Sequence, residues 1–153
     1  MPIQNFNRME RDWIIRNAEW ETESVLLYEV RSAVFVEEQG VDVSIERDGK
    51  DGQCYHSLAH DNSGKVLGTG RLSPEGKIGR LAVLKDWRGL GIGSEIMKNL
   101  IKQSESLGMS QTYLHSQVLV TEFYESLGYR QKGSIFEEAG IPHVVMLRDS
   151  DNA

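Results

Sequence analysis

Three glycines alternate along residues 88–93, in the run Arg-Gly-Leu-Gly-Ile-Gly, between a short apolar run and a helical pattern. Glycine adopts positive φ without steric cost and lets a ligand approach the backbone closely. The first amides of a helix have no acceptor inside the helix, and the helix dipole places partial positive charge beside them. A glycine-rich turn at the start of a helix therefore predicts a phosphate-binding site.

Two common phosphate-binding motifs do not fit this turn. A P-loop requires a lysine after its last glycine, whereas Ser94 follows Gly93. A dinucleotide-binding fingerprint requires Gly-x-Gly-x-x-Gly, and its last position would be Ser94 if the motif began at Gly89, or Ile96 if it began at Gly91. The turn thus predicts a different phosphate-bearing ligand.

The elements around the turn can be read from apolar periodicity. An apolar strand is expected over 77–83, directly before the turn, and spaced apolar residues from Ile92 to Leu107 predict a long helix after it. Gly108 supplies a C-terminal stop for that helix. Farther upstream, residues 53–60 and 65–72 predict two strands of a hairpin.

The outer parts of the chain complete an α/β (α+β) domain. We expect a first strand over 11–20, a helix that Thr22 caps and that runs towards Gly40, and a polar loop or short helix over 41–52 that is too polar for the core.

The second half adds a strand over 111–116, a shorter helix over 118–127, and a closing antiparallel pair over 129–136 and 143–148. The strand at 111–116 follows a helix, so it should run parallel to 77–83. The expected fold is a mixed, mostly antiparallel sheet of six or seven strands flanked by helices, in one domain over residues 1–153.

Two motifs resemble one known family. Arg88-x-x-Gly91-x-Gly93, after the Leu-Ala-Val strand, resembles the acetyl-CoA motif of the GNAT superfamily of N-acetyltransferases. Phe123-Tyr124-Glu-Ser-Leu-Gly-Tyr129 resembles that family's second signature. Shorter phrases, such as Val-Phe-Val-Glu-Glu-Gln at 34–39 and Gly-Ile-Pro-His at 140–143, are similar to its bacterial ElaA-like branch.

The resemblance implies how an acyl donor is bound. It implies a fold in which the fourth and fifth strands splay apart and acetyl-CoA, as co-substrate, lies in the opening. The pantetheine would pair with the backbone of Leu81, Ala82 and Val83. The pyrophosphate would meet the turn and helix start, namely Arg88, Gly89, Leu90, Gly91, Ile92, Gly93 and Ser94. Gln117 stands where the family commonly has Asn.

The resemblance also suggests catalytic residues. Tyr124 matches a tyrosine that can protonate the departing thiolate; the alternative is a tyrosine that only packs its ring in the core. His115, near the end of the fifth strand, is the preferred general base, because histidine exchanges protons near neutral pH. A purely structural histidine is the alternative for His115. Other candidates for the base are His56, His143, Glu46, Asp48 and Glu37 or Glu38, and Arg80 stands where some relatives place a base.

Composition excludes other classes of function. The formal net charge of −6 over 153 residues disfavours a general nucleic-acid-binding protein. No apolar run is long enough to span a membrane, and the first residues lack the features of a secretory signal. A single cysteine, Cys54, suits a reducing cytoplasm, and the spacing of the histidines predicts no metal site.

The sequence therefore predicts a cytoplasmic N-acetyltransferase that moves acetyl from acetyl-CoA to the amine of a small molecule by direct attack in a ternary complex. Two alternatives remain open: an acyl-CoA-binding module without turnover, and an acetyltransferase for protein lysines or N-termini. The acceptor is not identified, and both a monomer and a homodimer are compatible with the sequence.

Overall fold

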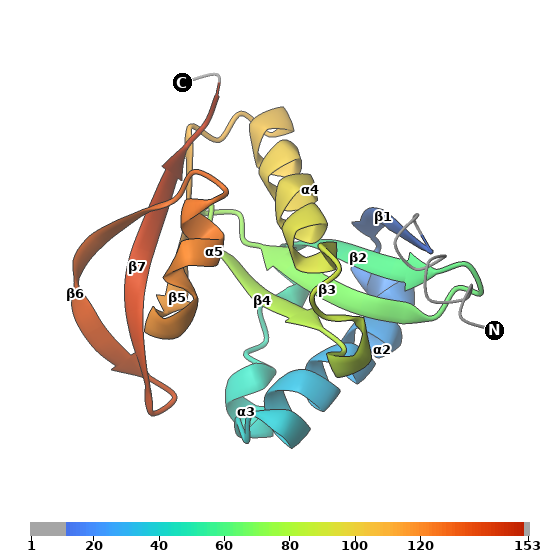
Figure 1. Ribbon diagram of the computed structural model, residues 1–153. Helices are drawn as coiled ribbons and strands as arrows, with labels where there is room; N and C mark the ends of the chain where they lie inside the picture. The colour runs from blue at the N-terminus through green and yellow to red at the C-terminus, as the bar shows by residue number, and fades with distance from the viewer. Residues whose placement is uncertain (1–11, 152–153) are drawn as a thin grey trace.

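The computed structural model describes residues 12–151. Their helices and strands follow in the order β1 (Trp13–Ala18), α2 (Trp20–Arg31), α3 (Val43–Glu46), β2 (Tyr55–Asp61), β3 (Val66–Leu72), β4 (Ile78–Val83), α4 (Ile92–Ser106), β5 (Gln111–Gln117), α5 (Thr121–Glu125), β6 (Arg130–Glu138) and β7 (Ile141–Asp149). A π-helical segment, Ser32–Glu38, continues α2, and 3₁₀ turns lie at Asp51–Gln53, Lys85–Trp87 and Val118–Val120. The predicted α+β architecture is confirmed (Figure 1).

The strands form two antiparallel sheets. One has the order β1-β2-β3-β4 and the other the order β5-β7-β6. The predicted parallel relation of the fourth and fifth strands is present as a single bridge, Lys77 to Tyr113. The expected single mixed sheet is therefore divided in two, because β4 and β5 diverge beyond that bridge.

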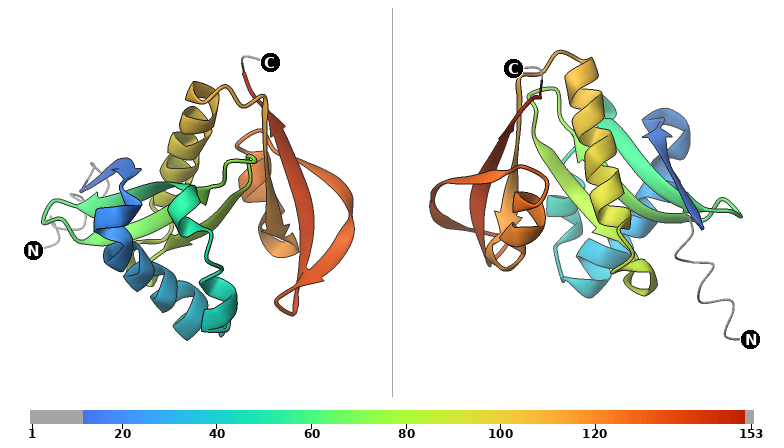
Figure 2. Two further views of the ribbon diagram at one scale, coloured as in Figure 1. Left: turned by 180° about the vertical axis from the view of Figure 1, so that it is seen from behind. Right: turned by 45° about the horizontal axis from the view of Figure 1, so that its top comes forward.

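Helix α4 crosses one face of the four-stranded sheet and α2 crosses the other (Figures 1 and 2). The close approach of α4 depends on two glycines of β3. A Cβ on Gly68 would lie 2.9 Å from Ile96 Cδ1, and one on Gly70 would lie 2.7 Å from Leu100 Cδ1. Both distances are too short for real side chains, so these glycines set how deeply α4 packs.

Two apolar cores result, one on each side of this sheet. The larger core joins α4 to both sheets and includes Ile96, Leu100, Leu114 and Met146, each at most 2% exposed. The smaller core lies under α2 and includes Leu27, Val30, Val34, Leu58, Val66 and Ala82. The larger core, on the α4 side, therefore fixes the position of β5 relative to β4 where the two strands diverge.

Several expected boundaries shift. Helix α2 begins at Trp20, after Glu19 as N-cap, and not at Thr22. The helix expected over 118–127 is a 3₁₀ turn followed by the short α5. Strands β6 and β7 extend closer to the hairpin turn than predicted, so Glu138 is a strand residue. Gly108 ends α4 as predicted, with a φ of +79°.

One expectation about burial is wrong. The polar stretch 41–52 contains two almost fully buried side chains, Glu46 and Asp51, each 2% exposed. They can be buried because arginines from α2 and β3 neutralise them, as described below.

Candidate functional site

The turn before α4 has open space beside its glycines. Gly89 and Gly91 have left-handed φ values of +78° and +94°, and a Cβ on either would meet nothing within 4 Å. Gly91 is the N-cap of α4, and no side chain caps the helix. The glycines are thus required by backbone conformation, and the first amides of α4 are left for an external acceptor.

Charged side chains around the turn are held away from its open side. Arg88 donates from Nε to the carbonyl of Val83 at 2.8 Å, and its two terminal nitrogens contact the Glu38 carboxylate at 2.6 and 2.8 Å. Glu95, in the first turn of α4, accepts a hydrogen bond from Trp13 Nε1 at 3.2 Å. Arg88 therefore ties the turn to the π-helical segment, and Glu95 is engaged with β1.

Strand β4 carries a bulge next to the place where it leaves β5. Thr69 pairs with Ala82 and Arg71 pairs with Gly79, so two residues of β4, Arg80 and Leu81, oppose one residue of β3. Arg80 has a φ of +53°, which is unusual for a residue with a side chain. Because β4 is an edge strand, its outer side from Leu81 to Val83 can pair with an amide-bearing ligand.

The alternation of side chains divides β5 into two faces. Leu114 and its alternate neighbours are buried in the core with α4, whereas Tyr113, His115 and Gln117 point to the opposite side. Residues opposed in a bridge share a face, so Lys77 points to the same side as Tyr113, and Gly79 follows it. His115 and Gln117 thus face the side on which β4 presents Lys77 and Gly79.

His115 forms a polar pair with the β6–β7 hairpin. Its Nδ1 lies 2.8 Å from Glu138 Oε1, and its ring stands edge-on to Phe136 at 5.1 Å between ring centroids. On the other side of Glu138, His143 Nε2 lies 3.9 Å from Oε2. Burial would raise the pKa of Glu138, but the hydrogen bond with His115 and the nearby charges lower it overall. Glu138 is thus held as a carboxylate beside His115.

Tyr124 lies on α5, on the core side of the diverging strands. Its ring packs edge-on against Phe123 and Tyr129, at 4.9 and 6.2 Å between centroids. Burial raises the pKa of Tyr124 to about 12. Phe123 also packs at the start of α4, 3.8 Å from where a Cβ of Gly93 would stand. The Tyr124 phenol is therefore held neutral on α5, next to the residue that packs at the start of α4.

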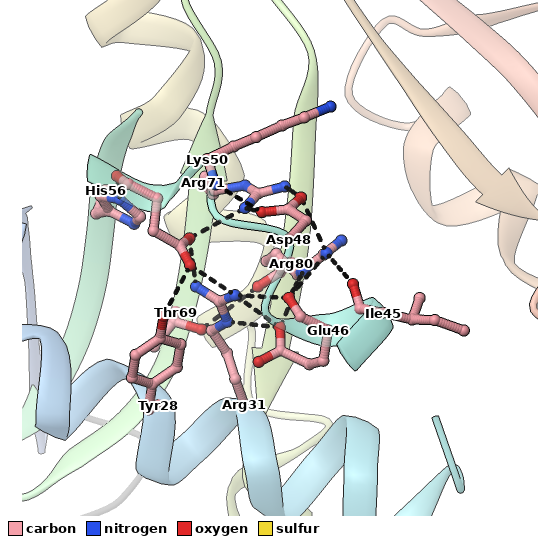
Figure 3. A network of polar contacts seen from close by, with 11 residues as sticks. Tyr28, Arg31, Ile45, Glu46, Asp48, Lys50, His56, Thr69, Arg71 and Arg80 are labelled. Carbon is pink, nitrogen blue, oxygen red and sulfur yellow. Dashed lines mark hydrogen bonds and ion pairs between the residues drawn. The ribbon is translucent and has the colours of Figure 1, made fainter. Parts of the chain in front are cut away.

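A network of arginines and carboxylates supports the bulge from the α2 side (Figure 3). Arg31, 1% exposed, donates to Glu46 Oε2 at 2.7 Å and to Asp51 Oδ1 at 2.7 Å. Arg80 donates from Nε to the same Glu46 oxygen at 2.9 Å. Arg71 completes the network with contacts to Asp48 at 2.9 Å and to Asp51 at 3.0 Å. The bulge is thereby fixed to α2 and α3.

This network accounts for most of the other residues considered as a base. Glu46 and Asp48 are paired with arginines, and Glu38 is paired with Arg88. His56 is 3% exposed, with Nε2 at 2.8 Å from the Asp51 carbonyl, and burial lowers its pKa. His143 Nδ1 lies 2.7 Å from the Ile141 carbonyl.

Sequence reasoning missed Glu138 and the buried network. Glu138 was expected in a turn, so its place beside His115 could not be foreseen. For the network there was one signal: Arg31 stands four residues after Leu27, within the buried stripe of α2 that includes Val30 and Val34. A charged residue in an apolar stripe indicates a buried partner.

Two surface pockets lie away from the candidate site. One of about 330 Å³ lies between α4 and the end of β7, with Lys102 and Arg148 in its lining. Another of about 270 Å³ lies between α2 and the β2–β3 turn, with Leu26 and Lys65 in its lining. Neither of these two pockets is lined by His115 or by residues of the turn.

Within residues 12–151, no group of three or more His, Cys, Asp or Glu side chains could hold a metal ion. Over the same range, no helix is long and apolar enough to cross a membrane.

Comparisons with known proteins agree with this geometry. The acetyltransferase (GNAT) domain family matches residues 21–149. A Bacillus subtilis protein provisionally named an acetyltransferase is 41% identical over 132 residues, which cover 82% of this chain and 89% of that protein. The Escherichia coli protein ElaA is 32% identical over 130 residues, which cover 80% of this chain and 85% of ElaA.

Solved structures show the same relationship. The crystal structure of Escherichia coli ElaA superposes with a TM-score of 0.79 at 26% identity, over 90% of this chain and 99% of ElaA. A GNAT-family acetyltransferase from Elizabethkingia anophelis, solved with acetyl-CoA bound, has a TM-score of 0.67 at 17% identity, over 90% of this chain and 98% of that one, which shows likeness of fold alone. The chain therefore belongs to the GNAT acetyltransferase family, is an acyltransferase enzyme, and has ElaA among its relatives.

Proposed function

We propose that the protein transfers the acetyl group of acetyl-CoA to the amine of a small molecule, by direct attack while both substrates are bound. The observation that carries this proposal is the uncapped start of α4 after two left-handed glycines with open space beside them. It lies next to the outer edge of β4, which is the last strand of its sheet. The GNAT fold is characteristic of acetyl-CoA binding, and these residues fit that ligand.

The pyrophosphate and the pantetheine of acetyl-CoA would each form hydrogen bonds with backbone groups. The pyrophosphate would accept hydrogen bonds from amides of residues 88–94, where the helix dipole adds to the attraction. The pantetheine amides would pair with the edge of β4 over Leu81, Ala82 and Val83. Gln117, at the end of β5, lies on the same face of that strand as His115. Its assignment to the donor stays a proposal drawn from the family resemblance.

The acceptor amine must lose a proton before or during attack. An alkyl ammonium with a pKa of ~10.4 is neutral in only about one molecule in 2,500 at pH 7. His115 can take this proton if its Nδ1–H donates to Glu138, because Nε2 then carries the lone pair. Glu138 would fix this tautomer and stabilise the imidazolium that forms, as a carboxylate partner does in other histidine bases.

The thiolate leaves as the new C–N bond forms and the C–S bond breaks. Tyr124 would donate its hydroxyl proton, or a hydrogen bond, to that sulfur, as the family resemblance implies. A phenol with a pKa of about 12 is a weaker acid than an ordinary thiol, whose pKa in water is ~8.5. Complete transfer of the phenol proton to the thiolate is therefore unfavourable when judged from these values. The same apolar surroundings raise the basicity of a thiolate and reduce this difference. We therefore assign Tyr124 a modest effect, mainly through hydrogen bonding.

The test combines binding and turnover. Acetyl-CoA at a concentration 100 times its dissociation constant should stabilise the native state by about 2.7 kcal/mol, which a thermal unfolding assay detects. Thiol release from acetyl-CoA, measured with a panel of small amines, should depend on the amine. An absent thermal shift at high acetyl-CoA concentration would refute the donor assignment. A shift without thiol release for any amine would favour a non-catalytic binding module.

A pair of histidine variants tests the base. His115→Gln should lower the rate of thiol release about 100-fold, the usual contribution of a general base, and keep the acetyl-CoA thermal shift. His60→Gln is the control, because His60 lies on β2 and its Nδ1 contacts the carbonyl of Asp61. Equal rates in the two variants would remove the role assigned to His115.

A further inference from the structure

Cationic side chains gather around Lys77, on the face of β4 that His115 also faces. Burial lowers the pKa of the Lys77 amine, and the nearby charges of Arg80, Arg71 and Lys50 lower it further, while Glu138 acts in the opposite direction. Lys77 therefore lies within electrostatic reach of the bulge on one side and of Glu138 on the other. Arg71 and Arg80 are paired with Asp48, Asp51 and Glu46 there, whereas Lys77 is in none of the ion pairs of that network.

Arg80 presents a fixed donor there. Its Nε and Nη2 make five hydrogen bonds, to the carboxylates of Glu46 and Asp48 and to the carbonyls of Ile45 and Glu46. Its Nη1 takes part in none of these bonds, and Figure 3 shows Arg80 within this network. The side chain is 24% exposed, whereas that of Arg31 is 1% exposed. The Arg80 guanidinium is thus held rigidly with one edge free.

Gly79 leaves space between these cations. It lies between Lys77 and Arg80 in the sequence, on the same face as Lys77, and a Cβ added to it would meet nothing within 4 Å. Its φ is not in the left-handed region, so glycine is not required there by backbone conformation. The open space therefore has Arg80 and Lys77 beside it, and His115 across the bridge to β5.

We propose that the acceptor carries an anionic group, a carboxylate or a phosphate, which Arg80 and Lys77 bind while its amine lies at His115 and Glu138. The proposal rests on the proposed function and specifies the class of acceptor. A guanidinium and an ammonium are the side chains that pair best with carboxylate and phosphate oxygens. The acceptor is accordingly a zwitterion, such as an amino acid or an aminoalkyl phosphate.

The experiment compares amines that differ only in the anionic group. Ethanolamine, serine and O-phosphoethanolamine form one set, and tyramine and tyrosine form another. With thiol release as the readout, kcat/KM for an anionic member should exceed that of its neutral counterpart by about tenfold or more, the effect of one charge-assisted hydrogen bond. Serine against O-phosphoethanolamine distinguishes carboxylate from phosphate. Equal or higher kcat/KM for the neutral amines in both sets would overturn the proposal.

Variants test whether the named residues cause the preference. Arg80→Met should reduce the ratio of anionic to neutral kcat/KM to about one, because the charge-assisted bond is lost. Since Arg80 also supports the network, Gly79→Val serves as a second variant that fills the open space and leaves the network intact. Lys98→Met, on the exposed side of α4, is the control and should keep the ratio. An unchanged ratio in both Arg80→Met and Gly79→Val would also overturn the proposal.

The acetyl-CoA thermal shift separates this inference from the proposed function. It should be retained in Gly79→Val and Lys98→Met. If the wild-type protein shows the shift and acetylates neutral amines best, only the anionic acceptor is wrong. If the wild-type protein shows no shift, the proposed function itself is wrong.

Discussion

The glycine turn after β4 and the arginine–carboxylate network beside β4 are built in different ways. The turn consists of consecutive residues, 88–94, and offers backbone and open space. The network joins residues from α2, α3, the segment before β2, β3 and β4, and it fills its space with paired charges, namely Arg31, Glu46, Asp48, Asp51, Arg71 and Arg80. The turn can accept a ligand because its glycines have no side chains. The network is stable because each of its charged side chains is paired with another.

This difference predicts how each region responds to mutation. A buried charge is tolerated only while its partners remain, so the network should lose much stability when one member is removed. At Gly89 and Gly91 an added side chain would meet nothing within 4 Å, so a substitution there should cost backbone strain and ligand binding rather than packing. Stability should therefore depend most on the network, and acetyl-CoA affinity on the turn.

The largest expected effect is the loss of Arg31. Arg31→Met leaves Glu46 and Asp51 without their shared buried partner and should lower the free energy of unfolding by about 3–5 kcal/mol. Urea denaturation measures this change. The control is Arg16→Met, which removes the partially exposed ion pair with Glu23 and should cost no more than about 1 kcal/mol. Similar losses in the two variants would mean that the network adds nothing beyond a surface ion pair.

A smaller effect is expected at the turn, on binding rather than stability. Gly91→Glu places a side chain and a negative charge in the open space and should weaken acetyl-CoA binding about 100-fold, or ~2.7 kcal/mol. The chain offers a matched control in Gly64→Glu, because Gly64 has a φ of +93°, close to the +94° of Gly91, and also has no neighbour within 4 Å of a Cβ. Both variants should unfold at lower temperature, and only Gly91→Glu should lose the acetyl-CoA shift. Retained binding in Gly91→Glu would reduce the turn to a structural role.

The same difference explains what could be predicted from the sequence. The turn, α4 and the stop at Gly108 were visible because each depends on residues close together in the chain. The segment 41–52 was expected at the surface because its polarity is a local property, whereas the burial of Glu46 and Asp51 depends on arginines 15 and 20 residues away in the chain. Ion pairs between residues far apart in the sequence do not change the local composition. The arginine–carboxylate network could therefore not be predicted from the sequence.

Boundaries failed for a related reason. Glu138 was expected in a turn because Gly140 and Pro142 are turn residues. The pairing of β6 with β7 nevertheless continues to Glu138 opposite Ile141, which brings the carboxylate to His115. The length of this hairpin depends on contacts between its two strands, such as the pair Phe136 and His143. Such contacts cannot be predicted from the order of residues alone.

Glu138→Gln tests whether this late-strand contact has a function. The variant keeps the shape of the side chain and removes the charge, so kcat/KM should fall about tenfold, as His115 is less well oriented. The acetyl-CoA thermal shift should be retained, because Glu138 lies on β6 and is not among the residues assigned to the donor. Lys77, His143, Tyr113 and Phe136 are the other groups around the pair, and none supplies a second carboxylate.

Glu137→Gln is the matched control for this variant. Glu137 is the exposed neighbour that pairs with Pro142, and its side chain points to the opposite face of β6. Its rate and pH profile should be those of the wild type. A purely structural role for Glu138 would lower the melting temperature of Glu138→Gln together with its rate, whereas a lower rate at unchanged stability would support the role beside His115.

The smallest expected effect is at Tyr124, where neither an open turn nor a charge network operates. Tyr124→Phe keeps the ring contacts with Phe123 and Tyr129 and removes one hydroxyl, so kcat should fall about three- to tenfold while the acetyl-CoA shift is retained.

The pKa of about 12 for Tyr124 also predicts how rate and stability depend on pH. The folded state keeps the phenol neutral, so kcat should not decline between pH 8 and pH 10 through its ionisation. Stability, by contrast, should be lost as the pH rises from the unfolded pKa of ~10 towards 12, because only the unfolded chain ionises readily there. A wild-type kcat that declines with a midpoint near pH 10, and no such decline in Tyr124→Phe, would show that the phenol is solvated during turnover rather than buried against the core.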